Sequence, residues 1–250
     1  MNGQFIALFC DFKYLTTKLL NKFNKDQLII FGYSLNKNDF DYICSDFQLK
    51  IFKNQKYHFI DLNNQDINQL INKYQFTKVY ITKSFKKISN IQNIFPNTYI
   101  EDDLTDINNA KQTLINADIN SFYNIAGFNY TFSGIVTHCN HLGRTIGFPT
   151  ANILTNDSLV IRNGVYLVKV IIGDKNIQFG MGDHWINRNN LKVFETYIFN
   201  FSNDIYNSKI TFELLDYIRD NQKINSLDQL KTLLNNDKKE CLKRMEKYNG

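Results

Sequence analysis

Two short segments of the chain hold residues whose types and spacing could do chemistry. The first is HLGRTIGFPTANI, residues 141–153, which contains one of only two prolines in the chain. Gly143 and Gly147 would let the backbone pass close to a ligand, because neither carries a side chain. Arg144 between them offers a guanidinium fork that suits phosphate oxygens. We interpret this segment as a candidate phosphate-binding loop.

The residues that follow in the same segment have the chemistry of a cation site. Pro149 fixes its own φ and favours an extended backbone just before it. Thr150 and Asn152 alternate with one alanine, so their side chains point the same way in an extended segment. A hydroxyl and an amide oxygen suit a hard cation such as Mg²⁺, or a phosphate. The alternative is a proline-stiffened turn facing water, and neither a Walker loop nor a dinucleotide fingerprint is present.

The second segment, VFETYIF, places an acidic residue on a strand face that is otherwise apolar. Alternation along an extended strand groups Glu195 with Val193, Tyr197 and Phe199. A carboxylate on such a face must be paired, solvated by a site, or raised in pKa. Glu195 is therefore a candidate general base. The alternative is a glutamate that reaches solvent at the end of a strand.

The second half of the chain predicts a β-barrel or sandwich that would position these residues. Short β-rich runs are separated by Gly, Asn and Asp turns: YTFSGIV, GVYLVKVII, KNIQFGMG, LKVFETYIFNF and KITFELLDYI. A helix follows, because Ser226 and Gln229 form a capping box. Its apolar stripe, expected to pack on the barrel, comprises Leu227, Leu230, Leu234, Cys241 and Met245.

The first half has a different chemistry and pattern. Strand-like runs such as FIALFCDF, QLIIFGYS, YHFIDL and KVYITKSF alternate with helical stretches, which favours a small parallel α/β sheet. All five arginines and nine of the eleven glycines lie from Gly127 onward. We therefore predict an α/β domain at residues 1–126 and a barrel domain at 127–250.

Composition narrows the classes of function. The chain is 43% hydrophobic and 21% charged over 250 residues, as in ordinary soluble proteins. The net charge of +5 forms no basic stripe interleaved with aromatics, so we expect no nucleic-acid partner. No stretch reaches the length of a membrane span and no signal peptide is evident. The four cysteines are scattered; we expect free thiols and a cytoplasmic protein.

The residues after 130 resemble riboflavin kinases, the kinase module of the bifunctional riboflavin kinase/FAD synthetase family. SGIVTHCNHLGRTIGFPTANI is similar to the family pattern S-G-x-V-x-x-G, a basic loop, then G-R-x-L-G-F-P-T-A-N. Later family motifs follow in order: GVY at 164–166, ETYI at 195–198, then IYNSKI, YIRDNQKINSLDQL and NNDKKE. The resemblance covers residues 131 to about 247 and implies a six-stranded antiparallel barrel with helices.

The resemblance also implies a nucleotide and a metal at the proline segment. The loop from Gly143 to Gly147, with Arg144, would hold the phosphates of ATP. Thr150 and Asn152 would bind Mg²⁺ and the nucleotide. The sequence does not decide between Mg²⁺ and Zn²⁺ as the preferred metal.

The remaining roles concern the flavin. Glu195 takes the position of the family's catalytic carboxylate, and Arg219 lies in the flavin-side loop before the last helix. The implied reaction is phosphoryl transfer from ATP to the ribityl 5′-hydroxyl of riboflavin, giving FMN. Such a transfer asks a protein mainly for positioning and electrostatics.

The chain departs from the family pattern at several positions. Cys139 replaces the glycine before the basic loop, and Leu142 stands where a basic or polar residue is common. GMGDHWINRNN replaces a G-x-R-P-T stretch, and Asn221 and Ile224 replace an acidic residue and a phenylalanine. We expect these changes to alter substrate affinity rather than the type of reaction.

Residues 1–126 are similar, in position and strand–helix pattern, to the nucleotidyltransferase domain with which that family converts FMN to FAD. Asp11 is kept, but Tyr14 and Thr17 stand where the family has phosphate-binding histidines, and Asn108 where it has an arginine. Lysines lack the bidentate fork that would replace them. We predict a degenerate domain without adenylyltransferase activity, kept for stability or for contacts in a homo-oligomer.

Two alternatives stay open. A divergent site in the first half would keep the protein bifunctional, with FAD as the end product. The other alternative is a flavin- or nucleotide-binding protein without catalysis, against which the presence of Thr150, Asn152 and Glu195 together argues.

Overall fold

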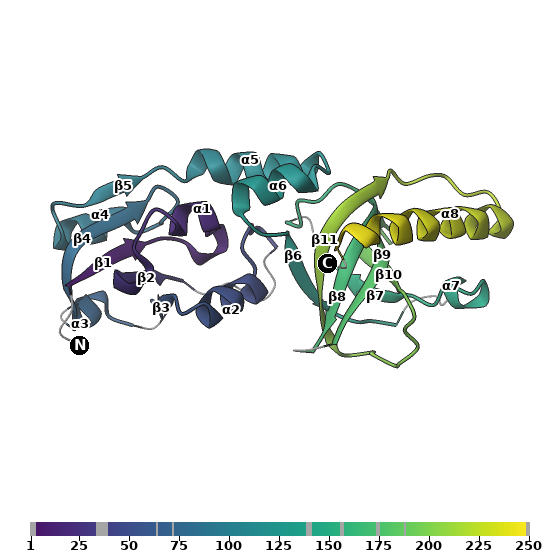
Figure 1. Cartoon of the computed structure of the whole chain (residues 1–250), viewed down its shortest axis with the longest axis horizontal. Coiled ribbons are helices and arrows are strands. Elements are labelled where there is room, and N and C mark those ends of the chain that lie inside the picture. The colour runs from purple at the N-terminus through teal and green to yellow at the C-terminus, as the bar shows by residue number, and fades with distance from the viewer. Residues whose placement is uncertain are drawn as a thin grey trace. The chain divides into compact units, whose positions relative to one another are not determined.

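The computed structural model describes residues 4–33, 40–63, 65–71, 73–138, 142–155, 158–173, 176–187 and 189–248. Two compact units are present (Figure 1). The first comprises Met1–Gln112 and Ser121–Phe128, and the second comprises Thr113–Asn120 and Asn129–Gly250. No helix in the described part of the chain is long and apolar enough to cross a membrane.

The first unit is built on a five-stranded parallel sheet in the order β3-β2-β1-β4-β5. The strands are β1 (Gln4–Phe9), β2 (Leu28–Gly32), β3 (His58–Asp61), β4 (Gln75–Thr82) and β5 (Tyr99–Glu101). Ala7, Leu8 and Phe9 of the central strand are fully buried, because a parallel sheet is covered on both faces. The predicted α/β unit with a parallel sheet is confirmed.

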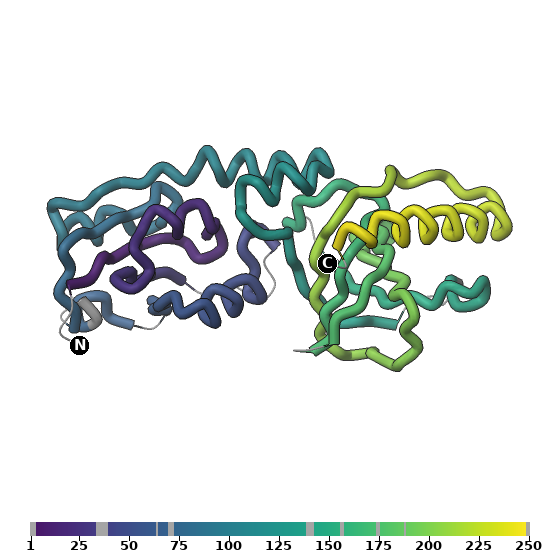
Figure 2. Tube along the Cα trace, viewed as in Figure 1, coloured from purple at the N-terminus to yellow at the C-terminus, as the bar shows by residue number. Residues whose placement is uncertain are grey.

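Short helices connect the strands of this sheet, and two more helices follow the last strand (Figure 2). The run TTKLLNKF forms only a four-residue helix, and two helices that the pattern did not predict, α2 and α4, follow later. The helices are α1 (Thr17–Leu20), α2 (Asp46–Asn54), α3 (Ile67–Ile71), α4 (Ile88–Ile94), α5 (Leu104–Ile115) and α6 (Ile119–Ala126). Single 3-10 turns occur at Phe12–Tyr14 and Lys25–Gln27.

The second unit is a six-stranded antiparallel sheet in the order β6-β11-β8-β9-β10-β7, curled into a nearly closed barrel. Its strands are β6 (Thr131–Ile135), β7 (Ala151–Leu154), β8 (Gly164–Ile172), β9 (Asn176–Ile186), β10 (Lys192–Ile198) and β11 (Lys209–Arg219). The Thr137 amide, just past β6, donates to the Asn152 carbonyl of β7 at 2.8 Å. That bridge joins the two edge strands and confirms the predicted barrel.

The inside of the barrel is aromatic. The rings of Phe132, Phe194 and Phe212 lie 4.9–5.4 Å apart, centroid to centroid, and all three side chains are fully buried. Strand alternation sends the neighbours of Phe194 to the other face of the sheet. Glu195 therefore lies on the outside of the barrel wall.

A long C-terminal helix, α8 (Leu227–Met245), covers part of this outer face (Figure 1); a 3-10 turn, Glu246–Tyr248, follows it. Its apolar side packs with Val165, Leu167 and Met181. The Ser226 hydroxyl accepts from the Gln229 amide at 3.2 Å, as the capping box predicts. Of the predicted stripe, Leu234, Cys241 and Met245 belong to this core cluster, whereas Leu227, the first residue of the helix, is 53% exposed.

Candidate active site

The two segments singled out in the sequence meet on the outside of the barrel. The Thr150 hydroxyl donates a 2.6 Å hydrogen bond to Glu195 Oε1. Asn152 on β7 lies directly opposite Glu195 on β10, and its Nδ2 lies 3.4 Å from Thr150 Oγ1. Asn152 is buried, whereas Thr150 and Glu195 are half-buried. One hydroxyl, one amide and one carboxylate thus converge at the edge of the wall.

The glycine loop before them is a tight turn held by its own backbone. The Phe148 amide donates to the Gly143 carbonyl at 2.7 Å, and a Cβ at Gly143 would lie 2.2 Å from the Phe148 oxygen. Gly147 has a φ of +88°, a region that side chains disfavour. The loop's own geometry therefore explains both glycines. A helical turn, α7 (Leu142–Thr145), leaves Arg144 exposed.

A cavity of about 520 Å³ opens beside this turn. Arg144 and Thr150 line one side of it, and the loop after β10, residues 201–206, lines another. Apolar side chains complete the lining: Val136, Pro149, Ala151 and Ile198. Its volume is in the range of small-molecule sites, and mixed apolar and polar walls are typical of them. The carboxylate, hydroxyl and cationic groups all lie on or next to one ligand-sized space.

The part of the chain that contains this site matches a known protein family. Residues 126–245 match the family model described as "Flavokinase: Riboflavin kinase". This part of the chain belongs to the riboflavin kinase family.

Relatives of known name agree on this region. The trifunctional protein RibF/MnmA of Mycoplasmoides gallisepticum is 36% identical over 138 residues, which are 53% of this chain and 20% of that protein. The bifunctional riboflavin kinase/FMN adenylyltransferase of Haemophilus influenzae is 36% identical over 130 residues, covering 51% of this chain and 42% of the relative. The enzyme of the same name from Buchnera aphidicola is 33% identical over 172 residues, which are 66% of this chain and 50% of that protein. The matched part thus spans half or less of these relatives.

One solved structure matches nearly the whole chain. It is titled as a macrolide-efflux protein from Streptococcus pneumoniae, and it superimposes with a TM-score of 0.69. The match covers 96% of this chain and 94% of the other at 20% identity. At that identity the likeness shows a shared two-part fold and nothing about activity.

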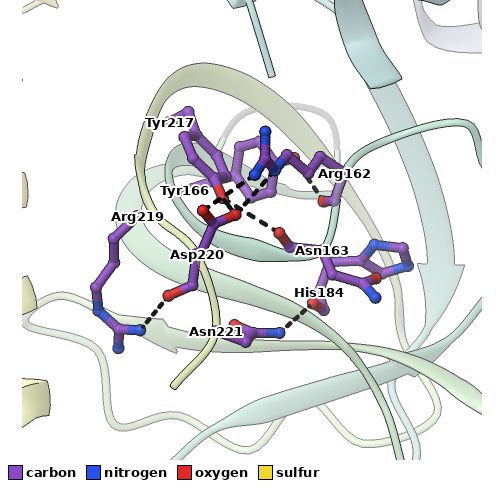
Figure 3. Close-up of polar contacts among 8 residues, drawn as sticks. All are labelled: Arg162, Asn163, Tyr166, His184, Tyr217, Arg219, Asp220 and Asn221. Atoms are coloured by element: carbon purple, nitrogen blue, oxygen red, sulfur yellow. Dashed lines mark hydrogen bonds and ion pairs between the residues drawn. The ribbon is translucent and has the colours of Figure 1, made fainter. Parts of the chain in front are cut away.

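Arg219, the residue predicted on the flavin side, lies at the end of β11 in the riboflavin kinase region. Its Nε and Nη2 bind the Asp237 carboxylate of α8 at 2.7 and 2.5 Å. Its Nη1 donates to the Asp220 carbonyl at 2.8 Å (Figure 3). The Asp237 side chain is 4% exposed. Arg219 therefore ties the loop after β11 to the helix that covers the wall.

The same loop is anchored by a second set of contacts that the sequence did not predict (Figure 3). Asp220 receives Arg162 Nε and Nη2 at 2.8 and 3.0 Å. The Tyr217 hydroxyl donates to the same carboxylate at 2.6 Å, and Asn221 Nδ2 donates to the His184 carbonyl at 2.9 Å. These contacts hold the start of the loop, directly after β11.

Asp183 on β9 is a candidate functional residue that the sequence analysis missed. It lies directly opposite Glu195, within the stretch that departs from the family pattern. Burial raises the pKa of Asp183 to about 6; nearby Glu195 and Asp237 add to the rise, whereas Arg219 and Asn221 oppose it. The signal that could have found it is register, since β9 and β10 are neighbours in the sheet.

The oxygen donors of the site suit a hard cation bound together with a phosphate. Thr150, Asn152 and Glu195 supply a hydroxyl, an amide and a carboxylate, and Mg²⁺ is usually held by few protein oxygens plus substrate phosphates. Among the described residues, no cluster of three or more His, Cys, Asp or Glu side chains could hold a metal alone. Cys139, which precedes the predicted basic loop, and His141 lie outside the described residues.

Proposed function

We propose that the chain phosphorylates riboflavin with ATP to give FMN. The observation that carries the proposal is the 2.6 Å hydrogen bond from Thr150 to Glu195 beside a ligand-sized cavity, in a region that belongs to the riboflavin kinase family. The hydroxyl of Thr150 and the guanidinium of Arg144 line the cavity, and the Glu195 carboxylate reaches it through Thr150.

Glu195 would act on the flavin. Its carboxylate accepts the proton of the ribityl 5′-hydroxyl as that oxygen forms a bond to the γ-phosphorus of ATP. The bond from that phosphorus to the β–γ bridging oxygen breaks, and ADP leaves with the electron pair. The Thr150 hydroxyl holds one carboxylate oxygen in place, which leaves Oε2 for the substrate. General bases contribute roughly 10²- to 10⁴-fold to rates.

The nucleotide would occupy the cavity between the proline segment and the loop after β10. Arg144 at its rim offers two N–H donors to the phosphates. The apolar lining from Val136 and Ile198 suits the adenine ring. In this placement the γ-phosphate lies near Thr150, which lines the cavity and also touches Glu195.

Thr150 and Asn152 would hold Mg²⁺ against the nucleotide. Bound there, Mg²⁺ would offset the negative charge of the transferring phosphate. In the structure the Asn152 Nδ2 donor lies 3.4 Å from Thr150 Oγ1, so Asn152 would present its Oδ1 acceptor to the metal. Asn152 is fixed on β7, and Pro149 stiffens the chain before Thr150. The chain contributes neutral oxygens and leaves room for phosphate oxygens.

We also propose that the first unit does not transfer adenylyl groups. Near the end of β1, where a parallel sheet binds ligands, the chain satisfies its own charges. The Tyr14 hydroxyl donates to Asp41 at 3.0 Å, and Lys111 and Lys13 pair with the same carboxylate. Although burial opposes it, the hydrogen bond from Lys111 helps to lower the pKa of Asp41. Cations committed in this way are poorly placed to receive phosphates.

The experiment is to incubate the purified full chain with riboflavin, ATP and Mg²⁺ and to separate the flavins by chromatography. FMN accumulating without FAD is the expected result. FAD as the end product would overturn the proposed loss of adenylyl transfer and favour a divergent site in the first unit. Unchanged riboflavin from folded protein would overturn the kinase. The proposed place of action is the cytoplasm, where ATP is made available.

A further inference from the structure

Asp183 lies in the middle of a row of directly opposed residues, all but one of them polar, that crosses the outer wall of the barrel. Asn152 on β7 is opposite Glu195 on β10, and Glu195 is opposite Asp183 on β9. The row continues through Val165 on β8 to Arg219 on β11. Directly opposed residues on antiparallel strands share a face. Asp183 therefore lies between the proposed site of transfer and the loop expected to hold the flavin.

The Asp183 carboxylate is incompletely satisfied by the described part of the protein. Its Oδ1 is buried and has no hydrogen-bond partner among the described residues. The Asn221 amide serves the carboxylate by a hydrogen bond that helps to lower its pKa. Arg219 attracts the carboxylate through space, but its own three hydrogen bonds go to Asp237 and to the Asp220 carbonyl. A buried acceptor without a donor costs free energy. Because Asp183 is directly opposite Glu195, a ligand bound at Glu195 could bring the missing donor.

The surroundings favour a neutral donor over a cation. Glu195 from β10 and Asp237 from α8 are the acidic groups that face Asp183, and Arg219 from β11 is the cation. Val165, its neighbour on β8, is apolar. A metal held by Asp183 and Glu195 would need further ligands, and no cluster of three acidic, His or Cys groups occurs among the described residues. A hydroxyl can donate to Oδ1 without adding charge.

We propose that the Asp183 carboxylate accepts a hydrogen bond from a hydroxyl of the ribityl chain of riboflavin and so positions the 5′-hydroxyl at Glu195. The inference rests on the proposed riboflavin kinase function. Adjacent strands lie about 4.8 Å apart, a distance that a few carbon atoms of a polyol span. A chain whose end lies at Glu195 then passes Asp183 on its way to the Arg219 loop, where the ring would bind.

The test compares two flavins that differ only in the polyol. Lumiflavin has the same ring system with a methyl group in place of the ribityl chain. Affinities for both are measured by quenching of flavin fluorescence, with Mg·ADP present, for the wild type, Asp183→Asn and Asp183→Ser. Glu213→Gln is the matched control, because Glu213 lies on β11 and accepts from Asn129 at 2.7 Å, away from the row.

The expected result is an approximately tenfold loss of riboflavin affinity in Asp183→Ser, which removes the carboxylate acceptor, and a smaller loss in Asp183→Asn, whose amide oxygen can still accept. Lumiflavin affinity should stay unchanged, and the KM for riboflavin should rise far more than kcat falls. Equal losses for both flavins, or no loss for either, would overturn the inference.

The two proposals can fail separately. Wild-type protein that binds riboflavin through Asp183 but makes no FMN would refute the kinase and keep the polyol contact. Wild-type protein that makes FMN while the variants bind riboflavin normally would refute the contact and keep the kinase.

Discussion

The Thr150 hydroxyl donates a 2.6 Å hydrogen bond to Glu195 Oε1. The bond links the end of the glycine–proline segment to a strand 45 residues later, and register places Asn152 opposite the same glutamate. The hydroxyl proposed to bind the metal and the carboxylate proposed as base touch each other, so they could act on one phosphoryl group and its acceptor. The role proposed for each residue in the transfer can therefore be tested by a separate substitution.

Replacing Glu195 with Gln should remove the base and keep the shape of the site. The amide cannot take the proton of the ribityl hydroxyl, so kcat should fall by roughly 10²- to 10⁴-fold. The fluorescence titration with riboflavin should change little. The measurement is the initial rate of FMN formation, with Glu213→Gln as control. A variant retaining full activity would remove Glu195 from the mechanism.

Replacing Thr150 with Ala should weaken the binding of Mg·ATP. The change deletes the hydroxyl proposed to hold the metal and frees Glu195 Oε1. The KM for Mg·ATP and the Mg²⁺ concentration at half-maximal rate should both rise, whereas affinity for riboflavin should be spared. Thr150→Ser keeps the hydroxyl and should restore most of the metal dependence. Metal titrations that are the same for Ala and Ser would contradict the assignment.

Arg144 should matter for the nucleotide alone. Arg144→Gln removes a charged donor from the rim of the cavity, and about a tenfold rise in the KM for ATP is expected. Arg144→Lys keeps the charge but loses the guanidinium fork, so its KM for ATP should lie between those of the wild type and Arg144→Gln. Steady-state kinetics with ATP varied at saturating riboflavin makes the comparison. A rise in the KM for riboflavin, with the KM for ATP unchanged, would place Arg144 at the flavin and contradict the assignment.

The ionised Asp183 carboxylate should destabilise the folded protein at neutral pH. Burial raises its pKa from 3.8 to about 6, so the folded state holds a proton that the unfolded state has released. Stability from this group is therefore lost as pH rises from about 4 to 6.

Asp183→Asn removes that penalty. At about 1.36 kcal/mol per unit of pKa shift, reduced because the site is partly solvated, the variant should gain about 2 kcal/mol in the free energy of unfolding at pH 8. The gain should vanish below pH 4. Urea unfolding at both pH values measures it. A variant that is less stable at pH 8 would show that Asp183 serves the fold.

The Arg219–Asp237 pair should be a strong structural contact. Removing one member of a buried ion pair leaves the other charge unpaired, so Asp237→Ala should lower the free energy of unfolding by about 3 kcal/mol. The double replacement with Arg219→Ala should cost less than the sum of the single ones. The Arg162–Asp220 pair is the control. Its side chains are 46% and 63% exposed, so its loss should change stability little. Additive losses at Arg219 and Asp237 would contradict the coupling.

Much of the barrel and its site could be predicted from residue types. Thr150, Asn152 and Glu195 stand out because polar groups on extended segments have strict alternation, and the structure brings them together. Asp183 could not be predicted in the same way, because its partner depends on which strands are neighbours in the sheet. Whether a glutamate or aspartate on a strand faces solvent or a covering helix is a tertiary property.

The C-terminal helix shows the same limit. The capping box at Ser226 is local chemistry and was confirmed. Leu227 was expected to pack on the barrel, but it is the first residue of the helix and is exposed. Asp237 carries no apolar signal, yet it is buried because Arg219 reaches it from β11. Helical periodicity finds a face of the helix, and the partner strand decides how much of that face is covered.

The most direct test of the central claim follows the phosphate itself. Purified full chain is mixed with riboflavin, Mg²⁺ and ATP labelled at the γ-phosphate, and label in FMN is counted over a single turnover for the wild type and Glu195→Gln. Label is expected in FMN from the wild type, and the rate from the variant should be at least about a hundredfold lower. Label that never reaches riboflavin, or equal rates for the two proteins, would contradict the proposed transfer.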